Sequence, residues 1–161
     1  MKRTELVENI RRKGSFLCVG LDPDPAKMPA SLAAKGADGV LEFNKAIVDA
    51  TAPYAVAYKP NLAFYETMGP DGLRVFEETV AYIREKYPDQ FVIADAKRGD
   101  IGETQKYYAQ AYFERLGVDA VTLSPFMGYD TLEPFLNYEE KGIYLLAVTS
   151  NPGSADVERQ G

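Results

Sequence analysis

The sequence contains no histidine, and this absence restricts the chemistry that the chain can perform. A Ser-His or Cys-His nucleophile is excluded, and so is a metal site with histidine ligands. Acid–base chemistry must therefore fall to lysine, aspartate, glutamate or tyrosine side chains.

Cysteine and long apolar runs are equally scarce. The single cysteine, Cys18, excludes an internal disulfide and fits a reducing compartment. No apolar run is long enough to span a membrane, and residues 1–13 are charged throughout, unlike a signal peptide. The net charge is −6 without a basic cluster, which argues against a nucleic-acid surface. We therefore expect a cytoplasmic protein that binds neither nucleic acid nor a membrane.

The length of 161 residues and the hydrophobic content of 46% suit a single domain, residues 1–161. The pattern predicts five strands that alternate with helices, which is typical of an α/β fold with a parallel sheet. The strands are predicted at about residues 15–22, 55–61, 91–97, 120–124 and 143–149. The helices are predicted at residues 1–13, 41–50, 70–87, 103–116 and 130–142. In the last of these, Asp130 and Glu133 resemble a capping box and Gly142 a helix stop.

Charged side chains gather where the predicted strands end. Asp95 and Lys97 close the third strand and, with a period of two, lie on the same face. Asp22 and Lys59 close the two strands before it, and parallel strands place these ends side by side. In α/β barrels this edge carries the active site, which favours catalysis over a purely structural ion network. Carboxylates around a lysine favour its charged form, which can stabilise a developing carbanion and then protonate it.

The run from Asp95 to Thr104 resembles the D-x-K-x-x-D-I-x-x-T signature of the orotidine 5′-phosphate decarboxylase family. The resemblance extends over about residues 15–156 and includes four other strand ends: Gly20-Leu21-Asp22-Pro23, Tyr58-Lys59-Pro60-Asn61, Ser124 to Asp130 and Thr149 to Ser154. It implies a TIM (β/α)8 barrel that forms a homodimer and uses neither a metal nor an organic cofactor. It also implies conversion of orotidine 5′-phosphate to UMP and CO2 in pyrimidine biosynthesis.

The same resemblance implies roles for the charged cluster. Lys97 would donate a proton to C6 of the substrate, and Asp95 would lie beside the leaving carboxylate. Lys59 would bridge the charged network and the ribose, and Asp22 would bind the ribose.

Four further residues would complete the site, the fourth being one of two candidates. Asp100 would reach into the active site of the partner subunit, with Ile101 and Thr104 beside it, so that each site is shared across the dimer. Either Ser124 or Thr131 would contact the pyrimidine, and the sequence does not decide between them.

The predicted strands number fewer than the family fold requires. An eight-stranded barrel needs about 250 residues, and the family holds its phosphate with the last strands. We therefore expect the front part of the barrel here, with exposed edges on the first and fifth strands. We also expect poor activity of these 161 residues alone, because remote binding energy supports this kind of catalysis.

Three alternatives remain open at this stage. Mg²⁺-dependent sugar-phosphate lyases and decarboxylases of the same suprafamily share the Asp-x-Lys-x-x-Asp strand end, but the continuation from Ile101 to Thr104 favours the nucleotide enzyme. A Schiff-base aldolase needs an uncharged lysine, which carboxylates around Lys97 disfavour. The non-enzyme alternative is an inert barrel fragment.

Overall fold

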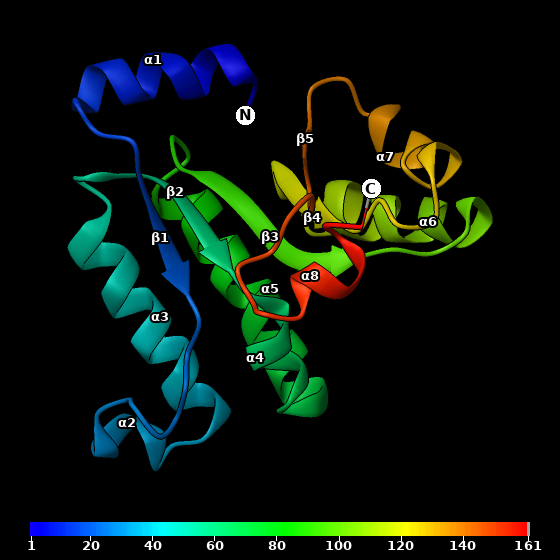
Figure 1. Cartoon of the computed structure of the whole chain (residues 1–161). Helices are drawn as coiled ribbons and strands as arrows, with labels where there is room; N and C mark the ends of the chain where they lie inside the picture. Colours follow the sequence, from blue (N-terminus) through cyan, green and yellow to red (C-terminus); the bar gives the residue numbers. More distant parts are fainter. Residues whose placement is uncertain (161) are drawn as a thin grey trace.

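The computed structural model describes residues 1–160 and contains a five-stranded parallel sheet in the order β1-β2-β3-β4-β5 (Figure 1). Each of the five strands overlaps a segment that the sequence pattern predicts as a strand. They are β1 (Leu17–Leu21), β2 (Ala55–Pro60), β3 (Phe91–Arg98), β4 (Ala120–Leu123) and β5 (Gly142–Leu145). Neighbours in sequence are neighbours in the sheet, so the carboxyl ends of all five strands share one edge.

The helices between the strands cover one face of the sheet. The helices are α1 (Arg3–Lys13), α2 (Ala30–Ala33), α3 (Ala37–Thr51), α4 (Leu62–Glu66), α5 (Gly69–Lys86), α6 (Gly102–Ala109), α7 (Glu133–Leu136) and α8 (Ser154–Val157), together with a π-helix, η1 (Gln110–Arg115), and a 3-10 turn, η2 (Tyr129–Thr131). The main core lies between α3, α5 and the sheet, where Tyr58, Phe76 and Ile83 are fully or almost fully buried. None of these helices is both long enough and apolar enough to cross a membrane within the described residues.

Helix α1 closes the amino-terminal end of the opposite face. Leu6 and Ile10 pack on a second, smaller cluster that includes Phe91 and Ile93 of β3. Figure 1 shows α1 lying across the end at which the strands begin. Gly14 ends the helix in the left-handed conformation with φ of 59°, as the sequence predicts. The carboxyl edge of the sheet is therefore the end that α1 leaves open.

The segment predicted as one helix over residues 130–142 is different in the structure. Asp130 lies in the 3-10 turn η2, and α7 is a single turn preceded by Leu132 without a side-chain cap. Gly142 does not stop a helix but begins β5, where its amide donates to the Asp119 carbonyl. A Cβ on Gly142 would lie 3.1 Å from Cβ of Ala120, so glycine here reflects close strand packing rather than a helix end.

The two outer strands are only partly covered. Leu17 and Cys18 of β1 are exposed, as are Tyr144 and Leu145 of β5. Strand β5 ends at Leu145 rather than at Thr149, and only the Leu146 amide continues its pairing, with Leu123 of β4. The sheet is therefore open at both edges, as five strands of a larger barrel would be.

Candidate active site

Asp95 lies at the centre of a charged cluster at the carboxyl edge of the sheet. Nζ of Lys97 is 2.7 Å from Oδ1 of Asp95, and Nζ of Lys59 is 3.0 Å from Oδ2. Strands β2 and β3 bring the two lysines together, because an isolated bridge pairs Asn61 with Asp95 just beyond the end of β2. The structure thus brings together three of the residues singled out from the sequence, with one carboxylate held between two ammonium groups.

Thr122 of β4 is a fourth member of this cluster, and the sequence analysis missed it. Its Oγ1 donates to Oδ1 of Asp95 at 2.9 Å and accepts from the Lys97 amide at 2.9 Å. A period of two along β4 places Thr122 on the same face as Ser124. The sequence signal for Thr122 was its hydroxyl group in an otherwise apolar strand, two residues before the predicted site residue Ser124.

These donors set the charge of the central carboxylate. Burial opposes ionisation of Asp95, whose side chain is 8% exposed, and would raise its pKa. The hydrogen bonds from Lys97, Lys59 and Thr122 outweigh burial and hold the pKa of Asp95 below its ordinary value. Asp95 is therefore a fixed negative charge at neutral pH.

The backbone at Lys97 has an unusual conformation. Its φ of 48° is the only positive φ at a non-glycine residue in the described part of the chain. On β3, Ala94 pairs with Val121 and Arg98 with Leu123, so β3 carries two more residues than β4 between these pairs. Such a left-handed residue costs about 1–3 kcal/mol and is typical of functional sites. At this bulge Asp95 is buried, whereas the Lys97 side chain is 47% exposed.

Asp22 follows β1 directly and is exposed. The residue before it is well anchored, because the Tyr65 hydroxyl donates to the Leu21 carbonyl at 3.0 Å. A small hollow beside Asp22 is lined also by Asp24, Lys27, Met28, Phe43 and Phe64. The hydrogen bonds of the described residues do not link Asp22 to the Asp95 cluster. Asp22 is a neighbour of the cluster only because it follows a strand whose carboxyl end lies at the same edge of the sheet.

The loop between β3 and α6 holds the three residues expected near a partner subunit. A carboxylate oxygen of Asp100 accepts from the Ile101 amide at 2.8 Å. The Ile101 side chain is 62% exposed, and Thr104 is half-buried on the first turn of α6. No hydrogen bond or ion pair of the described residues links Asp100, Ile101 or Thr104 to Asp95.

The two candidates for the pyrimidine contact differ in their surroundings. The buried Thr131 donates its hydroxyl to the Gly128 carbonyl at 2.7 Å, and its own carbonyl accepts from Gln105. Ser124 is half-buried at the end of β4, and its amide donates to the Arg98 carbonyl at 2.7 Å. The Thr131 hydroxyl is therefore used for a hydrogen bond within its own loop, whereas Ser124 lies at the carboxyl end of β4, beside the cluster.

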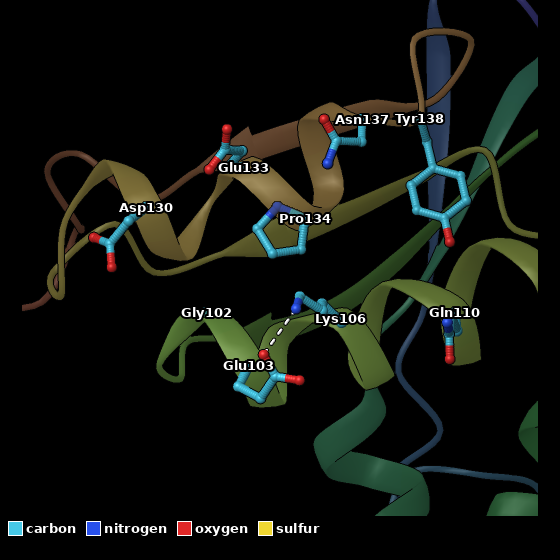
Figure 2. A pocket seen from close by; sticks show the side chains of 9 residues that line it. All are labelled: Gly102, Glu103, Lys106, Gln110, Asp130, Glu133, Pro134, Asn137 and Tyr138. Atoms are coloured by element: carbon cyan, nitrogen blue, oxygen red, sulfur yellow. Dashed lines mark hydrogen bonds and ion pairs between the residues drawn. The ribbon is translucent and has the colours of Figure 1, made fainter.

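A separate cleft lies between α6 and the segment from η2 through α7 (Figure 2). Its lining includes the ion pair of Glu103 and Lys106, 2.7 Å apart, with Glu133 and Asn137 facing them. None of the residues of the Asp95 cluster lines this cleft. This cleft is thus distinct from the catalytic candidate, which lies at the carboxyl edge of the sheet.

The described residues hold no group of three or more histidine, cysteine, aspartate or glutamate side chains that could bind a metal ion. Both oxygens of Asp95 are already engaged, Oδ1 by Lys97 and Thr122 and Oδ2 by Lys59. The cluster as it stands is an ion-pair network rather than a metal cradle.

Comparison with known proteins indicates the family of this chain. The model of the orotidine 5′-phosphate decarboxylase / HUMPS family matches residues 15–161. The chain is 60% identical to the orotidine 5′-phosphate decarboxylases of Phocaeicola vulgatus and Bacteroides fragilis, each over 158 residues and 98% of the chain. It spans 58% and 57% of the length of these two relatives.

Solved structures agree with the sequence comparison. Leishmania donovani OMP decarboxylase superposes with a TM-score of 0.84 at 38% identity, covering 98% of this chain and 58% of that one. Leishmania donovani UMP synthase superposes with the same TM-score at 39% identity, covering 98% of this chain and 32% of that one. The chain belongs to the orotidine 5′-phosphate decarboxylase / HUMPS family, and its five strands form part of the TIM barrel of that family.

Proposed function

We propose that this chain supplies the catalytic residues for conversion of orotidine 5′-phosphate to UMP and CO2, a step of pyrimidine biosynthesis. The observation that carries the proposal is the Asp95 carboxylate held between Lys59 and Lys97, 3.0 and 2.7 Å away. It occurs in a chain that is 60% identical to proteins named for this reaction. As an enzyme of nucleotide biosynthesis it would act in the cytoplasm.

The reaction begins with two like charges in contact. The substrate carboxylate, attached to C6, would lie against ionised Asp95, and their repulsion disappears as CO2 leaves. At about 4 Å and an effective dielectric of about 20, such an interaction is worth roughly 4 kcal/mol before solvation is considered. The low pKa of Asp95 supports this role, because a protonated carboxyl would not repel the substrate.

The bond between C6 and the carboxylate carbon breaks, and its electron pair stays on C6. The Lys97 ammonium group would stabilise this developing carbanion and then transfer a proton from Nζ to C6, which gives UMP. Lys97 would be left neutral and would regain a proton from solvent, to which its side chain is 47% exposed. No other reactant is needed to balance the step.

Binding of the rest of the substrate would use the neighbouring strand ends. Lys59, fixed by Asp95, would contact the ribose, and Asp22 would accept hydrogen bonds from its hydroxyl groups. Ser124 would contact the pyrimidine, because the Thr131 hydroxyl is committed to the Gly128 carbonyl. The phosphate would be held by segments that lie in the longer relatives beyond the part they share with this chain.

We also propose that the active protein is a homodimer with shared sites. The exposed side chain of Ile101, next to Asp100, is the supporting observation. Phe126 and Tyr129 are also exposed, on the loop after β4. Asp100 and Thr104 of one subunit would complete the site of the other.

The experiment is decarboxylation in heavy water. The 161-residue chain, and the same chain joined to the carboxyl-terminal part of the Phocaeicola vulgatus relative, are incubated with orotidine 5′-phosphate in D2O. From the joined protein we expect UMP that carries deuterium at C6, seen by proton NMR, because the exchangeable Lys97 ammonium group supplies the proton; the 161-residue chain alone should form little. A folded joined protein that forms no UMP would refute the proposed function.

A further inference from the structure

Arg98, directly after Lys97, is the residue we single out. Its side chain points away from the cluster and holds groups on two separate helices. Nη2 donates to Oε1 of Glu66 at 2.6 Å, at the last residue of α4. Nε donates to the Tyr112 hydroxyl at 3.0 Å, on the π-helix η1. The guanidinium group also stacks over the Tyr108 ring, 5.4 Å from its centroid.

Because of the position of Arg98 in β3, these contacts also affect the backbone at Lys97. Arg98 is the residue at which pairing with β4 resumes after the bulge, opposite Leu123. Its carbonyl accepts from the Ser124 amide at 2.7 Å. Upstream, the bulge is fixed by the bridge between Asn61 and Asp95. The strained Lys97 therefore lies between two anchors, and Arg98 is the downstream one.

The π-helix adds a second, independent observation. Helix α6 continues into η1 at Gln110, so the change from α-helical to π-helical hydrogen bonding falls within the turn that carries Tyr112. π-helical turns are rare and are frequent at functional sites. Here the turn carries Tyr112, buried and with its hydroxyl against the guanidinium group of Arg98.

We infer that Arg98 is a positioning residue, which holds Lys97 in its left-handed conformation and so keeps the ammonium group on Asp95. Without the guanidinium group, β3 would regain regular pairing with β4 and the Lys97 side chain would leave Asp95. Glu66 and Tyr112 support this role through Arg98. The catalytic meaning of the inference depends on the proposed function, but the structural effect does not.

The test is solution NMR of the isotope-labelled chain with Arg98→Met, which keeps the length of the aliphatic stem. The three-bond HN–Hα coupling and the Cα and Cβ shifts of Lys97 report its φ. The titration of the Asp95 carboxyl reports the ammonium contact. We expect Lys97 to lose the signature of positive φ and the pKa of Asp95 to rise toward its ordinary value.

Arg115→Met is the matched control, since Arg115 lies on η1 and pairs with Glu77 at the surface, away from β3. It should change neither readout. A folded Arg98→Met chain with the torsion of Lys97 and the titration of Asp95 both unchanged would overturn the inference.

Two milder variants cover the case in which Arg98→Met does not fold. Tyr112→Phe and Glu66→Gln each weaken one contact and leave Arg98 in place. Both should move the two readouts of Lys97 and Asp95 in the same direction by a smaller amount, and no movement in either would overturn the inference. Because neither readout needs substrate, failure of the proposed reaction would leave this result intact and distinguishable.

Discussion

Nζ of Lys97 contacts Oδ1 of Asp95 at 2.7 Å even though the backbone between them leaves the regular strand, with φ of 48° at Lys97. Strand alternation alone would place the two side chains on one face. The bulge has a further effect, because Asp95 stays buried while the Lys97 side chain remains accessible to solvent. Thr122 completes the arrangement by bonding both the Asp95 carboxylate and the Lys97 amide.

Replacement of Asp95 by asparagine should change stability in a pH-dependent way. The pKa of Asp95 is lower in the folded chain than its ordinary value, so its charge stabilises the fold above the unfolded pKa of about 3.9. That contribution is lost as pH falls through the folded pKa. In urea unfolding, Asp95→Asn should cost about 1–2 kcal/mol at pH 7, because the half-exposed lysines are partly screened.

This cost should shrink below about pH 4. Asp100→Asn is the matched substitution, and it should cost less at pH 7 because, among residues 1–160, Asp100 accepts a hydrogen bond only from the neighbouring Ile101 amide. A difference between Asp95→Asn and the unsubstituted chain that stays constant from pH 7 to pH 3 would contradict the assigned charge of Asp95.

Thr122→Val keeps the shape of the side chain and removes its hydrogen bonds. The Lys97 amide would lose its acceptor and Asp95 one donor, so we expect a loss of about 1–3 kcal/mol in unfolding free energy. The pKa of Asp95, followed by carboxyl NMR, should rise. Thr67→Val is the control, because that hydroxyl donates only to the Phe64 carbonyl at an exposed position. Equal effects of the two variants would argue against a role for Thr122.

Gly99→Ala should disturb the site through crowding. A Cβ at this position would lie 3.0 Å from Cβ of Ser124 and 3.3 Å from its carbonyl oxygen. The Ser124 segment must then shift by a few tenths of an ångström, which should raise KM for the pyrimidine substrate and lower stability by about 1 kcal/mol. Gly153→Ala, which meets nothing closer than 3.4 Å, should do neither. An unchanged KM in Gly99→Ala would show that Ser124 does not contact the substrate.

Removal of divalent cations should leave decarboxylation unchanged. Both oxygens of Asp95 accept hydrogen bonds from Lys97, Lys59 and Thr122, so a cation would have to displace an ammonium group. Turnover before and after treatment with EDTA is the measurement. Loss of activity that Mg²⁺ restores would instead favour the sugar-phosphate branch of the family.

The strands and the charged edge could be predicted because their signals are local. Apolar runs that end in Asp22, Lys59 and Asp95 mark strands whose ends share an edge, whatever the details of packing. The rule that the carboxyl ends of parallel strands share one edge is enough to predict that Lys59, Asp95 and Lys97 lie close together.

The remaining features depend on contacts between distant segments. Thr122 becomes a site residue only through the register of β4 against β3, and the left-handed Lys97 exists only because that register shifts. Gly142 has the sequence context of a helix stop, but the nearby Ala120 on the adjacent strand makes it the start of β5. Cys18 has a mid-strand position typical of a packed residue, yet it is exposed because the sheet is open beside β1.

The proposed reaction depends most directly on Lys97 as proton donor. Turnover of orotidine 5′-phosphate should be followed as loss of substrate absorbance for the chain joined to the carboxyl-terminal part of its relative, for Lys97→Ala, and for Lys106→Ala. Lys106 is an exposed lysine paired with Glu103, away from the cluster. We predict a loss of at least about 100-fold in kcat for Lys97→Ala and little change for Lys106→Ala. Equal turnover by Lys97→Ala and the unsubstituted protein would contradict the account.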